Sequence, residues 1–119
     1  MHKFDITLVG EANLDLLLYG LPEHLPVERE LLANGMAMVL GGSPAITAHN
    51  LAALGSCVGF ITALARDLFA SMCFEDLSLA GVDLSRSVRL HGEAQTGISV
   101  LLQHEKTRRT LTYPGSTGH

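Results

Sequence analysis

The sequence predicts an α/β fold with a parallel sheet core and an antiparallel β accessory. Short runs of alternating apolar residues are interspersed with two segments of helical periodicity, in the order strand, hairpin, helix, strand, helix, hairpin. Hydrophobic residues make up 47% of the 119-residue chain, which is enough for the core of one domain. Charged residues make up only 17%, which excludes an intrinsically disordered chain.

The first third of the chain is typical of β-structure. Residues 4–9 alternate between apolar and polar side chains and predict a first strand, and the apolar run over 14–19 predicts a second. Within residues 31–40, two apolar runs flank the dipeptide Asn34-Gly35. Because both residues tolerate positive φ, this dipeptide is typical of tight hairpin turns, and we predict a small β-hairpin there.

Two helices follow. Ser43 is predicted as the N-cap and Pro44 as the first helical residue of a helix that ends at Gly55. Apolar residues at helical spacing predict a second helix over 67–80, which ends at Gly81.

Strands separate and follow these helices. Residues 57–62 form an apolar run between the helices, and 88–90 could form a short strand. Residues 98–102 and 111–113 alternate on either side of a polar turn at 105–107, which predicts a second hairpin.

The charge and the apolar runs exclude several classes of protein. The net charge is −4 and the basic residues are scattered, so we expect no nucleic-acid partner. The longest unbroken apolar run is Met36 to Leu40, too short for a membrane span, and the first residues lack a secretory signal, so we expect a cytoplasmic protein. Cys57 and Cys73 lie in apolar surroundings and are interpreted as buried free thiols. The histidines and cysteines lack ligand spacing, so no metal site is predicted.

Residues 31–65 contain no Asp, Glu, Lys or Arg. A stretch of this length without formal charge is difficult to keep on a solvated surface. We therefore expect it to be largely buried, or to line a pocket or a partner interface.

A first candidate binding loop, residues 10–15, follows the first strand. Ligands of parallel α/β sheets gather at the carboxyl ends of the strands. The side chains of Asn13 and Asp15 could there hydrogen-bond to neighbouring hydroxyl groups of a ligand. The alternative is that the aspartate only caps a turn.

A second candidate loop, Gly41-Gly42-Ser43, leads into the first predicted helix. Paired glycines allow a ligand to approach the backbone, and the N–H groups of a helix N-terminus form an array of donors. The alternative is a plain tight turn before a capped helix. The chain has neither a P-loop nor a nucleophile elbow, and no catalytic residue is predicted.

Taken together, the motifs resemble those of the ribokinase-like (PfkB) carbohydrate kinases. Residues 10–15 resemble the opening substrate loop and residues 41–55 the di-glycine motif. Residues 58–69, 80–83 and 96–97 resemble later signatures in the same order. The resemblance extends through nearly the whole chain.

The resemblance implies a fold and a set of site residues. The fold class is the N-terminal part of a ribokinase-like parallel-sheet sandwich with an antiparallel β lid, incomplete because residues 1–119 lack the nucleotide-binding half. Asn13 and Asp15 would bind sugar hydroxyls, and Gly41 and Gly42, with Ser43 beside them, would close over the sugar. The segment at Asn34-Gly35, together with 98–113, would contribute to a lid that often forms a homodimer.

The resemblance also implies an activity. The parent enzyme would transfer the γ-phosphoryl group of ATP to a hydroxyl of a sugar or nucleoside. ATP and Mg²⁺ are implied for the full-length family, but no site for either is visible in this chain, so the 119 residues alone are expected to be inactive. Ile46 stands where the family often has Asn, and Ala65 and Ala70 stand where it has Gly.

Two other interpretations stay open at this point. One is a non-catalytic fragment that binds a sugar or nucleoside, or that oligomerises. The other is a small α/β domain whose glycines are purely structural. The mean hydropathy of +0.28 indicates exposed apolar surface in a chain of this size, with dimerisation or poor solubility as the consequence.

Overall fold

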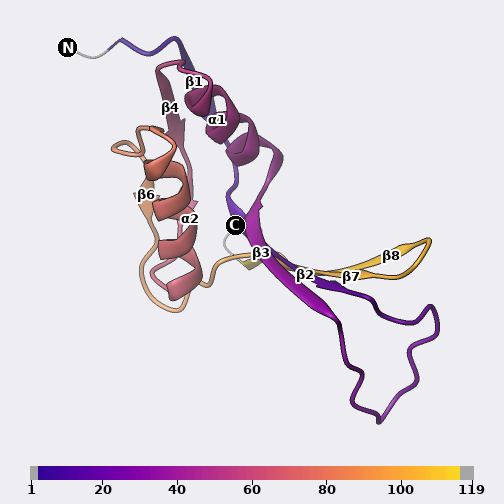
Figure 1. Ribbon diagram of the computed structural model, residues 1–119. Coiled ribbons are helices and arrows are strands. Elements are labelled where there is room, and N and C mark those ends of the chain that lie inside the picture. Colours follow the sequence, from indigo (N-terminus) through magenta and orange to yellow (C-terminus); the bar gives the residue numbers. More distant parts are fainter. Residues whose placement is uncertain (1–2, 116–119) are drawn as a thin grey trace.

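The computed structural model describes residues 3–115 (Figure 1). Main-chain hydrogen bonds group its strands into three sheets. Two small parallel sheets pair β1 with β4 and β5 with β6, and a four-stranded sheet has the order β3-β2-β7-β8. The predicted parallel core with an antiparallel accessory is confirmed. The elements are β1 Ile6–Val9, β2 Asn13–Tyr19, β3 Gly35–Gly41, α1 Ser43–Ala53, β4 Val58–Ile61, β5 Ala63–Leu64, α2 Leu68–Leu79, β6 Val88–Arg89, β7 Ile98–Gln103 and β8 Arg108–Tyr113.

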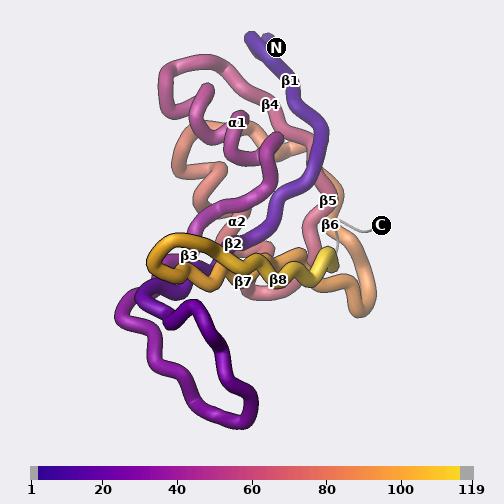
Figure 2. The backbone as a smooth tube through the Cα atoms, turned by 90° about the vertical axis from the view of Figure 1, so that its right-hand side faces the viewer, coloured from indigo at the N-terminus to yellow at the C-terminus, as the bar shows by residue number. Residues whose placement is uncertain are grey.

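The four-stranded sheet is organised around β2. This strand pairs antiparallel with β3 along its whole length and parallel with β7 over residues 14–18. The second hairpin is confirmed, since β7 and β8 pair antiparallel around a turn at 104–107. In both views the sheet extends away from the two helices (Figures 1 and 2).

The sheet has two faces, because successive side chains of a strand point to opposite sides. We name them after neighbouring residues of β2. The register places these residues on the Asp15 face: Asn13, Asp15, Leu17, Tyr19, Gly35, Ala37, Val39, Gly41, Ser99, Leu101, Gln103, Arg108, Thr110 and Thr112. It places these on the Leu16 face: Leu14, Leu16, Leu18, Met36, Met38, Leu40, Ile98, Val100, Leu102, Arg109, Leu111 and Tyr113.

Helix α1 begins one residue earlier than predicted. Its N-cap is Gly42, with φ of 92°, and not Ser43, and the helix has no side-chain capping hydrogen bond. Ser43 is already helical and Pro44 follows it, so the glycine takes the left-handed turn that a serine would adopt at a cost. At the other end, Gly55 N–H donates to Ala52 O and Ser56 N–H to Leu51 O, and the predicted glycine stop is confirmed.

Helix α2 is joined to the four-stranded sheet by its N-cap. The Asp67 carboxylate accepts hydrogen bonds from the N–H of Ala70 at 2.8 Å and the N–H of Thr96 at 2.8 Å, and also from the Thr96 hydroxyl. Thr96 is buried two residues before β7 begins. Desolvation by burial raises the pKa of Asp67, but the hydrogen bonds from Thr96 and Ala70 outweigh it, and the net pKa is lowered.

The core lies between the parallel strands, the helices and the base of β2. Phe60 of β4, Leu14 of β2, Leu64 of β5 and Leu77 of α2 are its largest fully buried side chains. Further members are small, among them Ala45, Ala48, Ala65, Ala70 and Cys73. Only part of the predicted apolar face of α1 is buried, because Ile46 is 40% exposed and Leu54 83% exposed.

The two thiols lie in different environments. Both are free, but Cys73 is buried whereas Cys57 is half-buried. Desolvation, and then the nearby charge of Asp76, raise the pKa of Cys73 to about 12. The thiol of Cys73 is therefore protonated at neutral pH and unreactive, as its apolar sequence context predicts.

The hairpin predicted at Asn34-Gly35 is wrong. Gly35 begins β3, which pairs with β2 and not with residues 31–33, and Asn34 N–H donates to Tyr19 O at 2.9 Å. Neither residue has the positive φ that a tight hairpin turn requires; that conformation falls to Gly20, with φ of 74°. The longer pairing of β3 with β2 forms in place of the local turn, and a loop over 20–34 joins β2 to β3.

The loop over 20–34 is tied to the turn between β7 and β8. Glu23 accepts hydrogen bonds from Lys106 N–H at 3.1 Å and from the Thr107 hydroxyl at 2.6 Å, and its carbonyl accepts one from Arg109 at 3.0 Å. The bond from Thr107, with that from Lys106 N–H, lowers the pKa of Glu23. Figure 2 shows that the rest of this loop extends beyond the sheet.

The chain is extended and exposes apolar surface, as the composition predicts. Its radius of gyration is 16.3 Å, against about 13.5 Å for a compact domain of this length. Its accessible surface is 7638 Å², against about 6200 Å² for a compact monomer of this mass. Residues 1–2, considered above for a secretory signal, lie outside the described range. Within residues 3–115, no helix is long and apolar enough to cross a bilayer.

Replacing Asp67 by alanine should loosen α2 from the four-stranded sheet. The variant loses an N-cap and leaves the buried Thr96 N–H unpaired, so we expect a loss of about 2–3 kcal/mol in the free energy of unfolding. Because the pKa of Asp67 is lowered on folding, this contribution is present above pH 3.8 and is lost as the pH falls through the folded pKa. Urea denaturation at pH 7 and pH 3 measures both effects.

Glu75→Ala on the exposed side of the same helix is the control and should change stability by less than about 0.5 kcal/mol. Equal losses in the two variants would contradict the anchoring role of Asp67.

Candidate functional site

Three of the residues predicted for binding converge where β2 begins and β3 ends. Asn13 and Gly41 are paired across the two strands, and Asp15 lies two residues further along the same face. A Cβ atom on Gly41 would stand 2.6 Å from Asn13 Oδ1 and 2.7 Å from Asp15 Oδ1. The absence of a side chain at position 41 is therefore what allows both polar side chains to occupy this place.

Asn13 contributes an acceptor without a donor. Its Oδ1 atom is buried and has no hydrogen-bond partner within residues 3–115. Leaving a buried acceptor unpaired costs about 1–3 kcal/mol, which a hydroxyl or amine donor from a ligand would recover.

Asp15 supplies a half-buried carboxylate for which no hydrogen bond is found in the described part of the chain. Its pKa is raised, because desolvation by burial outweighs the opposing effect of the positive charge of Arg108. A carboxylate in this state gains more from hydrogen-bond donors than one in water, since part of its hydration is already lost.

The backbone beside these side chains carries further donors. Gly42 adopts φ of 92° and lies so close to Glu11 that a Cβ atom would stand 2.7 Å from Glu11 O. Because α1 lacks a side-chain cap, its first-turn N–H groups are not used by a capping residue. Ser43 is exposed at the start of α1. Asn13, Asp15, Gly41 and Gly42 thus form one cluster, with Ser43 at its border.

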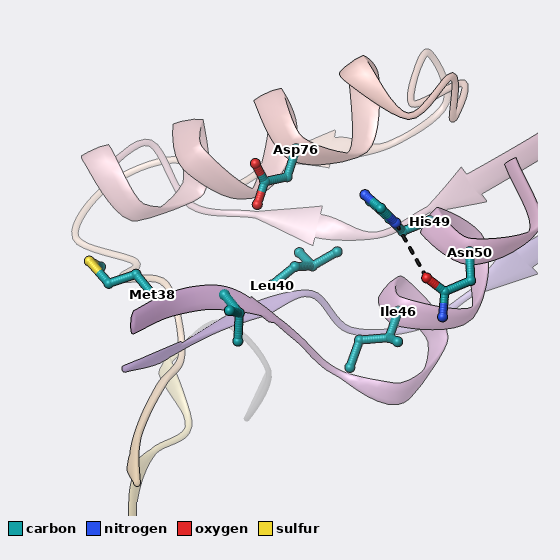
Figure 3. Close-up of a pocket in the computed structure, with 7 residues that line it drawn as sticks. Met38, Leu40, Ile46, His49, Asn50 and Asp76 are labelled. Carbon is teal, nitrogen blue, oxygen red and sulfur yellow. Dashed lines mark hydrogen bonds between the residues drawn. The ribbon is translucent and has the colours of Figure 1, made fainter. Parts of the chain in front are cut away.

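A separate pocket lies on the Leu16 face of β3 (Figure 3). It has a volume of about 300 Å³ and is open to solvent, and β3, α1 and α2 border it with Leu40 at its base. His49 of α1 and Asp76 of α2 point toward it, and His49 Nδ1 lies 3.4 Å from Asn50 Oδ1. All its lining residues except Asp76 belong to the uncharged stretch 31–65, which therefore lines a pocket and is not simply buried.

Sequence reasoning missed the residues that β7 and β8 bring to the Asp15 face. Ser99 is paired with Asp15, and Thr112 with Ser99, with their hydroxyl oxygens 2.9 Å apart. Arg108 lies further along β8 on the same face. The alternation within residues 98–113 predicts which of these side chains share a face. Only the register of β7 against β2 shows that this is the face of Asp15.

The positions where the chain departs from the resembled pattern have different surroundings. Ala65 and Ala70 are fully buried members of the core, so their methyl groups fill space there. Ile46 lines the pocket of Figure 3 and not the cluster around Asp15. Within residues 3–115, no three His, Cys, Asp or Glu side chains gather in a way that could hold a metal ion.

The motifs, the sheet order and the cluster can be compared with known proteins. Residues 3–118 match the family model described as pfkB family carbohydrate kinase. The chain belongs to this family. The 5-dehydro-2-deoxygluconokinase of Clostridium perfringens is 32% identical over 98 residues, which cover 82% of this chain and 28% of that protein.

Solved structures agree with the fold. A fructokinase with bound ATP from Xylella fastidiosa is 27% identical with a TM-score of 0.75, covering 94% of this chain and 34% of that one. A ribokinase from Cryptococcus neoformans in complex with ADP is 22% identical with a TM-score of 0.73, covering 92% and 34%. The predicted ribokinase-like fold class is confirmed. The chain spans only 28% to 34% of the length of these proteins.

A methyl group at position 41 should displace the two polar side chains of the cluster. In Gly41→Ala, the contacts with Asn13 Oδ1 and Asp15 Oδ1 force both side chains to move, and overpacking should cost about 1–3 kcal/mol. NMR spectroscopy should show shifted Asn13 side-chain amide signals and a changed pKa of Asp15.

Gly35→Ala is the matched control on the same strand and face, since its Cβ would meet Tyr19 at an ordinary 3.4 Å. Unmoved Asn13 and Asp15 signals in Gly41→Ala would show that position 41 does not shape the cluster.

Proposed function

We propose that the chain is the N-terminal, sugar-binding and lid portion of a carbohydrate kinase that transfers the γ-phosphoryl group of ATP to a hydroxyl of a sugar or nucleoside. The convergence of Asn13, Asp15 and Gly41 carries the proposal. Membership of the pfkB family and the match to kinases over about a third of their length support it.

Each residue of the cluster has a role in the proposed complex. The Asp15 carboxylate accepts hydrogen bonds from two neighbouring hydroxyls, and Asn13 Oδ1 accepts a third. Gly41 and Gly42 admit the sugar to the backbone, where the N–H groups of Ser43 and Ala45 at the start of α1 donate to its oxygens, since Pro44 has no N–H. The four-stranded sheet then acts as the lid, with its Asp15 face toward the sugar.

The nucleotide and the metal have no proposed residues in this chain. The fructokinase and ribokinase structures contain ATP and ADP, respectively. Within residues 3–115 no acidic cluster fits Mg²⁺, and the sequence has no P-loop for phosphates. The residues present bind and orient the acceptor, and phosphoryl transfer requires positioned phosphates in addition.

Asp15→Asn should abolish or strongly weaken sugar binding. Loss of charge-assisted hydrogen bonds worth about 1.5–3 kcal/mol weakens binding about 10- to 100-fold. NMR titration of the chain with pentoses, hexoses and nucleosides provides the measurement. Because the pKa of Asp15 is raised on folding, ionisation at neutral pH opposes folding, so the variant should be at least as stable as the wild type.

Asp76→Asn is the matched control, because Asp76 lines the other pocket, on the Leu16 face. It should leave sugar binding unchanged. Binding that survives Asp15→Asn but is lost in Asp76→Asn would move the sugar to the pocket of Figure 3 and overturn the proposed site.

A non-catalytic, oligomerising role is the second candidate, and the Leu16 face favours it. Met36 is 67% exposed, Leu111 59% and Tyr113 51%, all on this one face. Burial of such a face against a second copy releases about 25 cal/mol for each Å² of apolar surface. We infer that the sheets of two chains pair through their Leu16 faces to form a homodimer.

Leu111→Lys should weaken this association at least about tenfold, because burying an unpaired charge is unfavourable. Thr110→Lys places the same charge on the opposite face of the same strand and should have no effect. Sedimentation equilibrium over a range of concentrations measures both. Equal behaviour of the two variants, or a wild type that stays monomeric at high concentration, would exclude this interface.

A further inference from the structure

The Asp15 face carries charge at only two of its strand positions. Among the paired residues of this face, Asp15 is the one acid and Arg108 the one base. Between them lie the hydroxyls of Ser99, Thr110 and Thr112 on neighbouring strands, beside the apolar side chain of Leu101. A negative pole, a band of hydroxyl groups and a positive pole thus follow one another across one face of the sheet.

The separation of the two poles suits a ligand placed between them. Thr112 aligns with Asp15 through Ser99, and Arg108 lies four residues further along β8. Four residues of a strand span about 13 Å, at about 3.3 Å each, and the two strand spacings from β2 to β8 add about 10 Å across the sheet, so the Cα atoms of Asp15 and Arg108 lie about 16 Å apart. At this separation of their backbone positions, Asp15 and Arg108 do not form a direct ion pair. The long arginine side chain shortens the gap, in agreement with the influence of its charge on Asp15.

Arg108 differs from its neighbour Arg109, which is hydrogen-bonded to the turn between β7 and β8 and to the loop over 20–34. Arg109 lies on the Leu16 face, where its guanidinium is 2.7 Å from His104 Nε2 and donates to Glu23 O. For Arg108, no hydrogen bond or ion pair with a side chain is found within residues 3–115, and the residue is exposed. Its five N–H donors are therefore available to a ligand.

We propose that Arg108 selects substrates that carry an anionic group, a carboxylate or a phosphate, at the end of the sugar remote from Asp15. This inference rests on the proposed function, because it takes the Asp15 cluster as the place where the sugar hydroxyls bind. The guanidinium group matches the geometry of both anions and can bind either with two parallel hydrogen bonds. Asp15 repels the anionic end, so the two charges also fix the direction in which the sugar lies.

The inference is tested with pairs of ligands that differ in charge but share their hydroxyl pattern. D-gluconate is compared with D-glucitol, and D-fructose 6-phosphate with D-fructose, by NMR titration of the 119-residue chain at low and high salt. At least one anionic ligand should bind about tenfold more tightly than its neutral partner at low salt, and the difference should shrink at high salt. The first pair reports a sugar acid and the second a sugar phosphate.

Two variants of Arg108 test whether this residue selects anionic ligands or only supports the fold. Arg108→Gln should reduce the affinity for the preferred anion about tenfold, to that of its neutral partner, and leave neutral-sugar binding unchanged. Arg108→Lys, which keeps the charge but loses the bidentate geometry, should restore part of the preference. Arg109→Gln is the matched control on the opposite face and should preserve the preference.

The outcomes distinguish this inference from the function on which it rests. Asp15-dependent binding of neutral sugars with no preference for either anion would overturn the role of Arg108 and leave the proposed function standing. An equal loss of anionic and neutral ligands in Arg108→Gln would overturn it as well. Absence of Asp15-dependent binding for every ligand would overturn the proposed function itself.

Discussion

The position of β2 between β3 and β7 is the constraint on which the rest of the structure depends. Both edges of this strand are hydrogen-bonded, so its register fixes which side chains share each face of the sheet. On one face of β2, Leu14 is buried in the core. On the other face, Asn13 and Asp15 lie beside Gly41. A shift of one residue would exchange the two sets, burying a carboxylate in the core and exposing its leucines.

The hydrogen bonds between Asp67 and Thr96 connect this sheet to α2. Thr96 lies just before β7, so the carboxylate that caps α2 also holds the entry to the strand that flanks Asp15. The candidate cluster around Asp15 involves a compromise, because a desolvated Asp15 and an unpaired Asn13 Oδ1 both cost stability. Such costs are typical of sites built to be satisfied by a ligand. The Leu16 face likewise leaves large apolar side chains exposed to solvent.

Elements with strong local signals could be predicted from the sequence. The glycine stop at Gly55, the helix that precedes Gly81 and the β7–β8 hairpin depend on contacts between near neighbours, and each is confirmed. Where a local preference competed with long-range pairing, the prediction was wrong. Asn34-Gly35 is typical of a hairpin turn, but pairing along the whole of β2 yields more hydrogen bonds than a local hairpin could. Likewise Gly42 and not Ser43 is the N-cap, because the chain enters α1 with a positive φ of 92° that glycine adopts without strain.

The sequence by itself determined the α/β class, the family resemblance, and Asn13, Asp15, Gly41 and Gly42 as candidate binding residues. Residue type and spacing carry that information, since the functional group that a side chain offers is set by its residue type. Only the tertiary structure decided that these residues meet and that Ile46 lines a different pocket. It also decided that Arg108 shares the face of Asp15 while Arg109 does not. The register between strands distant in the sequence determines these relations, and the alternation within a single strand cannot specify it.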